Sequence, residues 1–162
     1  LRNSRGQYIL TLDELEAGSL DTAEPVIEVE GDLILQLKKD TISHLESQGP
    51  VIKKGTGTLT IRGEGSLELE SADAEAISSD WNGEELDADH PSAVCLEAGN
   101  LTFTGAGSGI VDETVELAGA QGTITATSTS GAAVKTAHVK REGSNSDKLE
   151  LIGATAVAVP ES

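Results

Sequence analysis

The sequence predicts an all-β fold, namely a right-handed, single-stranded parallel β-helix of about five to six coils. Short runs of residues alternate between apolar and polar side chains, as half-buried strands do. Glycine-rich turns, rather than helical patterns, separate these runs. A phrase of the form Gly-x-Leu/Ile-x-hydrophobic recurs with a period of roughly 20–26 residues, which is typical of stacked repeats. The alternative is an antiparallel β-sandwich, although only 2% of the residues are aromatic and sandwich cores usually contain large rings.

The clearest repeat covers Pro50–Ser71 and predicts three short strands. These strands are expected at Val51–Ile52, Thr58–Ile61 and Leu67–Glu70. Leu67 and Leu69 alternate with Glu68 and Glu70, so one side of the last strand is apolar and the other faces water. Strands this short do not form a domain alone, so we expect them to stack on the matching strands of neighbouring repeats.

The other repeats lie on both sides of this one. We expect residues 1–24 to form a cap with a first strand at Tyr8–Leu12, and residues 25–162 to form the β-helix. The units after the cap are Pro25–Ser47, Pro50–Ser71, an interrupted unit from Ala76 to Gly105, and two weaker units over residues 114–128 and 132–159. The expected inward column contains Leu33, Leu59, Leu101 and Ile124, and the expected outward column contains Thr60, Thr102 and Thr125.

Two insertions break the repeat pattern, at Asp80–His90 and at Arg141–Asp147. Insertions in stacked arrays usually lie on one face and often carry the binding function. The stretch from residue 64 to residue 89 contains ten acidic residues and no Lys or Arg. Because stacked carboxylates repel one another unless they are screened or bridged, we expect calcium to stabilise this region.

The first insertion is the candidate cation site. Carboxylate and amide oxygens are the ligands that Ca²⁺ prefers. The candidate ligands are Asp80, Asn82, Glu84, Asp87 and Asp89. The first three alternate as at the start of a calcium loop, but Glu85 and Pro91 stand where an EF-hand requires Gly and Glu. Two interpretations remain open, a bound Ca²⁺ ion and a solvated acidic loop.

The same insertion contains the only tryptophan of the chain, Trp81. An exposed indole ring offers a flat apolar area on which a sugar ring stacks. Trp81 and the neighbouring Asn82 are therefore the candidate carbohydrate contacts. The alternative is that the ring anchors the loop against the wall of the coil.

The charge of the chain excludes two classes of partner. The net charge is −17, whereas nucleic acids and anionic membrane surfaces select Lys-rich and Arg-rich proteins. No apolar stretch approaches the roughly 20 residues of a membrane span, so we expect no membrane insertion. Cys95 is the only cysteine, which excludes an intrachain disulfide.

Several phrases resemble the repeats of a known family. GPVIKKGTGTLTIRGEGSLELES, AEAISS and SAVCLEAGNLTFTG are similar to the coils of secreted bacterial carbohydrate-binding β-helix domains, typified by clostridial cellulose- and pectin-binding proteins. The resemblance covers Pro25–Gly105 best. It implies a polysaccharide-lyase-like fold, a secreted or cell-surface location, and binding of acidic polysaccharide and of calcium. The partner expected for this chain is a polysaccharide or a host or cell-wall glycan.

The sequence offers no signature of catalysis. It contains no nucleophile motif, phosphate-binding loop or cofactor fingerprint. A lyase of this fold needs a basic residue beside a cation site, and Arg62 and Arg141 are both distant in sequence from the acidic loop. We therefore expect a non-catalytic, extracellular carbohydrate-binding or adhesin-type domain. The alternatives are a structural stalk of a surface protein and a degenerate polysaccharide lyase.

Overall fold

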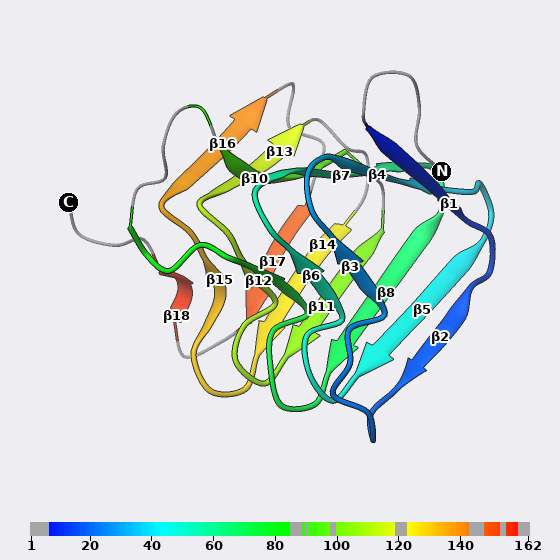
Figure 1. Cartoon of the computed structure of the whole chain (residues 1–162), viewed down its shortest axis with the longest axis horizontal. Helices are drawn as coiled ribbons and strands as arrows, with labels where there is room; N and C mark the ends of the chain where they lie inside the picture. Colours follow the sequence, from blue (N-terminus) through cyan, green and yellow to red (C-terminus); the bar gives the residue numbers. More distant parts are fainter. Residues whose placement is uncertain are drawn as a thin grey trace.

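The computed structural model of the chain is a parallel β-helix with three faces. It describes residues 7–84, 89, 91–97, 100–118, 123–142, 148–152 and 155–158, with side chains described as far as residue 140. Figure 1 shows strands that wind around a common core, with the start of the chain at one end of the stack and its last strands at the other. All strand pairs among the described residues are parallel. The predicted β-helix is confirmed, and the antiparallel sandwich is wrong.

In the described part of the chain, the strands form three sheets of six strands each, with one strand from each coil in every sheet. Sheet A contains β1 (Tyr8–Leu12), β4 (Leu33–Leu37), β7 (Gly57–Gly63), β10 (Ser92–Leu96), β13 (Thr114–Ala118) and β16 (His138–Glu142). Sheet B contains β2 (Glu16–Ser19), β5 (Ile42–Ser47), β8 (Ser66–Ser71), β11 (Leu101–Gly105), β14 (Thr123–Ser128) and β17 (Lys148–Ile152). Sheet C contains β3 (Ile27–Val29), β6 (Ile52–Lys54), β9 (Ile77–Ser79), β12 (Ile110–Val111), β15 (Ala132–Lys135) and β18 (Thr155–Ala158).

The core consists of columns of aliphatic side chains that run along the inside of each sheet. In sheet C the column contains Ile27, Ile52, Ile77, Ile110 and Val134. Alternation places every second residue of a strand inside, so the stacked coils bury the apolar half of each strand. Each fully buried Leu, Ile or Phe side chain contributes roughly 1.5–3 kcal/mol relative to an exposed one.

The register corrects one detail of the predicted columns. Leu33 and Leu59 share a column in sheet A, whereas Leu101 and Ile124 stack on Leu67 in sheet B. Thr102 and Thr125 likewise stack on each other in sheet B, while Thr60 lies in sheet A. Strands of the two sheets carry the same alternating pattern, so periodicity alone does not tell which sheet a strand joins.

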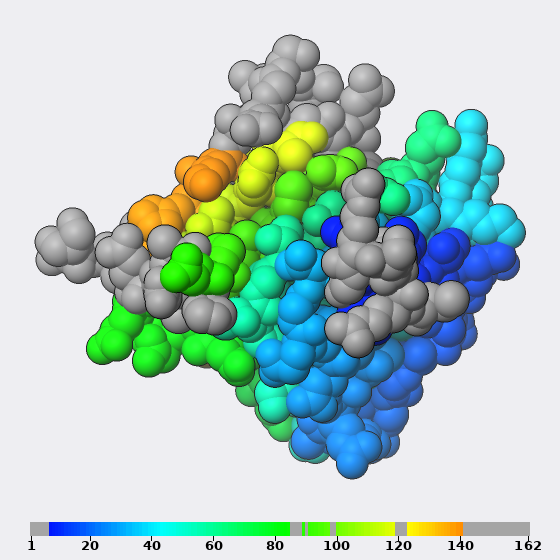
Figure 2. Space-filling view, turned by 45° about the horizontal axis from the view of Figure 1, so that its top comes forward, coloured from blue at the N-terminus to red at the C-terminus, as the bar shows by residue number. Residues whose placement is uncertain are grey.

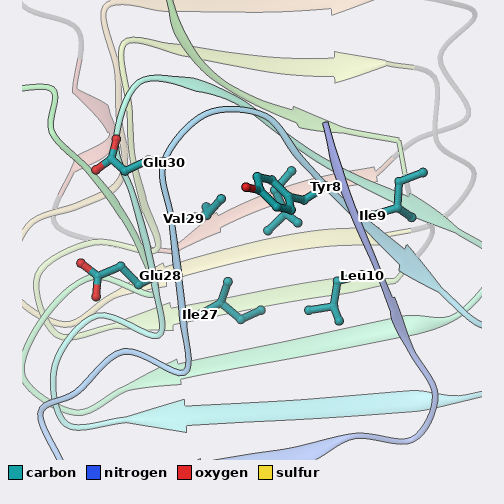
Figure 3. Close-up of a pocket in the computed structure, with 8 residues that line it drawn as sticks. Tyr8, Ile9, Leu10, Ile27, Glu28, Val29 and Glu30 are labelled. Carbon is teal, nitrogen blue, oxygen red and sulfur yellow. The ribbon is translucent and has the colours of Figure 1, made fainter. Parts of the chain in front are cut away.

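The N-terminal segment forms part of the first coil. β1 pairs with β4 and β2 pairs with β5, so the strand expected at Tyr8–Leu12 is confirmed, and the described residues of the segment expected as a cap begin the first coil at the end of the stack. Leu12 is buried in the core, while Leu10 is 40% exposed. Between β1 and β3 an apolar hollow opens at this end, where Tyr8, Ile27 and Val29 face one another and Glu30 points away (Figure 3).

A charged cluster lies inside the corner between sheets C and A. Lys54 Nζ donates hydrogen bonds to Asp112 Oδ2 and Ser92 Oγ, each at 2.7 Å, and to the Gly55 carbonyl oxygen at 3.2 Å. The Lys54 and Asp112 side chains are both 0% exposed. Ser92 Oγ donates to Asp112 Oδ1, which also accepts from the Glu113 amide at 2.8 Å. All three ammonium protons and both carboxylate oxygens are therefore satisfied, as burial of charge requires.

This cluster lies at the corner where the first insertion interrupts the β-helix, between β9 of sheet C and β10 of sheet A. Residues 55–56, 112–113 and 136–137 turn this corner in three other coils, whereas residues 80–91 connect β9 to β10. Lys54 ends β6 and Asp112 follows β12, and β9 lies between these two strands in sheet C. The Lys54 side chain therefore spans two strand spacings of about 4.8 Å to reach Asp112. The corner is otherwise tight, because a Cβ at Gly57, whose φ is +102°, would lie 2.6 Å from the backbone carbon of Gly31.

Candidate functional site

The first insertion leaves the β-helix between β9 and β10. Figures 1 and 2 show its described residues, coloured green, extending toward the end of the stack that holds the later coils. Asp80, Asn82, Glu84 and Asp89 are exposed. Asp87, His90 and residues 143–147 of the second insertion lie outside the described residues, whereas the first two residues expected in that insertion, Arg141 and Glu142, end β16.

Trp81 is an internal anchor of this loop. Its side chain is 4% exposed, and its Nε1 donates a hydrogen bond to the Glu84 carbonyl oxygen at 2.7 Å. The Glu84 amide donates to Asn82 Oδ1 at 3.1 Å, which closes a compact turn. The expected exposed indole face is therefore wrong, because the polar edge of the ring and its apolar faces are both used within the fold. Asn82 is exposed, and its role as a carbohydrate contact stays a prediction.

The acidic side chains of the loop do not converge among the described residues. Within that part of the chain, one group of at least three His, Cys, Asp or Glu side chains brings its ligand atoms within 4.8 Å of one another, and it lies on sheet B. Asp80, Glu84 and Asp89 do not form such a group. Calcium binding by the loop, with Asn82 and Asp87 as further ligands, stays a prediction.

The outer side of sheet B is the second candidate site, and we call it the polar face. It is defined by four pairs of side chains, one pair on each of four successive strands: His44 and Glu46, Glu68 and Glu70, Thr102 and Thr104, and Thr125 and Thr127. Paired residues share a strand side because they are two positions apart, and successive coils repeat them about every 4.8 Å. The face is therefore a two-column array of hydrogen-bonding groups.

His44 is the centre of the acidic half of this face. Its Nδ1 lies 3.3 Å from Glu68 Oε2, and its Nε2 lies 3.3 Å from Glu46 Oε2. On its other side, β2 places Glu16 opposite it. Partial burial disfavours the charged imidazole, but the hydrogen bonds and negative charges of Glu46 and Glu68 outweigh this, so the pKa of His44 is raised above its ordinary value of 6.5.

Glu70 completes a potential ligand set on the same face. It lies directly opposite Glu46, one coil further along. A His44 ring nitrogen and one carboxylate oxygen from each of Glu46 and Glu70 lie within 4.8 Å of one another. The arrangement can hold a shared proton or a cation, and its carboxylates can accept hydrogen bonds from hydroxyl groups.

Sequence reasoning missed this group because the histidines, taken alone, show no metal-ligand spacing. The signal was present in two successive repeats, as His44-x-Glu46 in TISHLES and Glu68-x-Glu70 in SLELES. Two positions along a strand share a side, and equal positions in successive coils are neighbours. Placing the two phrases in register brings all four side chains together.

Comparisons of the chain with protein-family models, with curated proteins and with solved structures found no match. Among the described residues, no helix has the length and apolar character needed to cross a lipid bilayer.

Proposed function

We propose that this chain is a non-catalytic binding domain of a secreted or surface-attached protein, and that its polar face contacts a polysaccharide. One observation carries the proposal. The hydrogen-bonding groups of the polar face repeat in register over four successive strands, so they present a regular array to a ligand that is itself a repeating chain.

The threonine half of the array supplies the contacts that fit sugar hydroxyls. Thr102, Thr104, Thr125 and Thr127 are all partly exposed, and each hydroxyl is both a donor and an acceptor. Their β-branched side chains have few rotamers, so little conformational entropy is lost on binding. The contacts are individually weak, and affinity for a polymer depends on several acting together.

Charge favours a neutral polysaccharide over a polyuronate. The neighbouring half of the face carries three glutamates, and the net charge of the chain is −17. An anionic polymer is repelled unless cations screen or bridge the two surfaces. Stacking on aromatic rings contributes little, because Trp81 and Phe103 are buried and Tyr8 lines the end hollow.

The non-catalytic assignment rests on the composition of the same strands. β5, β8, β11 and β14 contain no Lys or Arg. A lyase needs a base for proton abstraction and positive charge to stabilise the developing carbanion, and no Lys or Arg side chain of these strands supplies that charge.

The test is a glycan array probed with the whole chain, in calcium and in chelator. We expect binding to neutral polysaccharides, and a loss of about tenfold or more in the variant Thr104→Val with Thr127→Val, since the hydroxyls are lost at nearly constant volume. The matched control is Thr60→Val, a partly exposed threonine on the outer side of sheet A, which should bind as the wild type does.

Two results would contradict the proposal. If the chain binds no glycan under either condition, the structural stalk becomes the better interpretation. If it releases unsaturated uronides from polyuronate, it is a lyase.

A further inference from the structure

We infer that His44, Glu46 and Glu70 form a binding site for one divalent transition-metal ion, with Zn²⁺ as its experimental probe. This site is distinct from the calcium interpretation of the Asp80–His90 loop, and it does not depend on polysaccharide binding. It rests on the arrangement of side chains from two adjacent strands.

The two strands place the three ligands on one side of sheet B. His44 and Glu46 are two positions apart on β5, and Glu70 lies on β8 opposite Glu46. The three candidate ligand atoms already lie within 4.8 Å of one another. Zn²⁺ holds imidazole nitrogen and carboxylate oxygen at about 2.0–2.2 Å, so the side chains need to contract by on the order of 1 Å. Partly exposed glutamates on a surface make such movements by changing rotamers.

Glu68 fixes the imidazole in the orientation that a metal requires. Its Oε2 lies 3.3 Å from His44 Nδ1, while His44 Nε2 faces Glu46 at 3.3 Å. Metal-binding histidines generally donate their other ring N–H to a carboxylate in this way, which fixes the tautomer and raises the basicity of the ligand. Glu68 is therefore a positioning residue, and His44 Nε2 is the nitrogen that meets the metal.

The chemistry of the donors selects the class of metal. One imidazole with two carboxylates suits Zn²⁺ and its neighbours in the first transition series, whereas Ca²⁺ prefers a shell of oxygens alone. Three protein ligands also leave a fourth tetrahedral position, which faces outward from the sheet and is open to solvent.

The surrounding charge favours a bound cation. Glu46 and Glu70 are like charges directly opposite each other in a ladder, and such pairs are destabilising. Glu16 on β2 and Glu68 on β8 flank His44 with further negative charge. A divalent ion offsets this repulsion, and the net charge of −17 raises the local concentration of cations.

The experiment is calorimetric titration of the whole, chelator-treated chain with Zn²⁺ in the absence of any glycan. We expect one site per chain that requires His44. His44→Gln should weaken binding by more than about a hundredfold, and Glu68→Gln by about 10–100-fold through loss of orientation. His138→Gln is the matched control, because His138 is exposed on sheet A, and it should leave the affinity unchanged.

A second measurement replaces Zn²⁺ with Co²⁺, because the visible d–d absorption of Co²⁺ is strong in a four-coordinate protein site and weak in the hydrated ion. The intensity should disappear in His44→Gln and persist in His138→Gln, while Ca²⁺ in excess should not displace the ion. None of the substituted side chains is buried, since His44 is partly exposed and Glu68 and His138 are exposed, and circular dichroism of each variant checks that the strands are intact. Zn²⁺ binding that is absent, or that is equal in His44→Gln and wild type, overturns the inference and leaves the glycan proposal untouched.

Discussion

Two charged clusters of this chain differ in burial. The buried cluster uses its charges to hold the fold together, whereas the exposed cluster keeps charges that a ligand can contact. Inside the corner, Lys54 and Asp112 are both 0% exposed and lie 2.7 Å apart, with Ser92 bonded to each. On the polar face, His44 is 34% exposed and lies 3.3 Å from carboxylates of Glu46 and Glu68.

The buried ammonium of Lys54 has a directly paired carboxylate and a full set of hydrogen bonds, whereas the exposed cluster gathers several carboxylates around one imidazole. Removing charge from water costs several kcal/mol per ion, so a buried cation persists only with a partner and a full set of hydrogen bonds. At the surface, water and salt screen an excess of negative charge. The polar face can therefore keep several carboxylates around one imidazole, and that excess is what a ligand can use.

The largest effect is expected from breaking the buried pair. Asp112→Ala leaves Lys54 charged and unpaired in the interior, which should lower the free energy of unfolding by about 3–5 kcal/mol. Urea denaturation followed by circular dichroism measures this change. The control is Asp13→Ala, which removes an exposed partner 2.6 Å from Lys38 and should leave the urea midpoint nearly unchanged.

A double variant tests whether the charge itself is responsible. Lys54→Met with Asp112→Leu removes both charges at similar volume, and such replacements are often neutral or stabilising. We expect it to regain most of the stability that Asp112→Ala loses. If the double variant is as unstable as Asp112→Ala, the loss comes from packing at the corner and not from the unpaired ammonium.

The next effect concerns the anchor of the insertion. Trp81→Ala removes a side chain that is 4% exposed together with its hydrogen bond to Glu84, and should destabilise the chain by about 1–3 kcal/mol. If the polar face binds glycan as proposed, the glycan array should show the same binding in this variant as in wild type. If Trp81→Ala keeps the stability of wild type but no longer binds glycan, the indole ring is a carbohydrate contact and not an anchor of the loop.

The calcium interpretation of the loop predicts a smaller effect. If the loop binds Ca²⁺, the ion at about ten times its dissociation constant stabilises the chain by about 1.4 kcal/mol, which raises the melting temperature relative to chelator. Asp80→Asn with Asp89→Asn should abolish this rise, while His44→Gln should retain it. An unchanged melt in wild type identifies the insertion as a solvated acidic loop.

The sequence predicted the fold because alternation and repeat period are local signals. The sequence also allows the inward orientation of Lys54 to be predicted, because Ile52 faces inward and residues two positions apart on a strand share a side. The ion-pair partner of Lys54 could not be predicted, because Asp112 lies 58 residues away in the sequence and an insertion separates the two. The polar face was missed for a related reason, since His44 and Glu70 meet only when the coils are stacked in the correct register.

The smallest effect is a pH dependence at the polar face, measured in metal-free protein. Glu46 and Glu68 raise the folded-state pKa of His44, and Glu16 and Glu70 add negative charge nearby. A raised pKa contributes stability that is fully present below the unfolded value of about 6.5 and is lost as the pH rises through the folded value. The contribution should be less than about 1 kcal/mol, because the groups are partly exposed and screened.

The comparison of wild type with His44→Gln isolates this contribution. Urea midpoints at about pH 6 and about pH 9 should differ more in wild type than in the variant, with the excess stability of wild type on the acid side. His138→Gln should follow wild type. Equal pH dependence in wild type and His44→Gln would contradict this prediction. It would show that the charged imidazole does not stabilise the folded chain at this face, unlike the buried ammonium of Lys54.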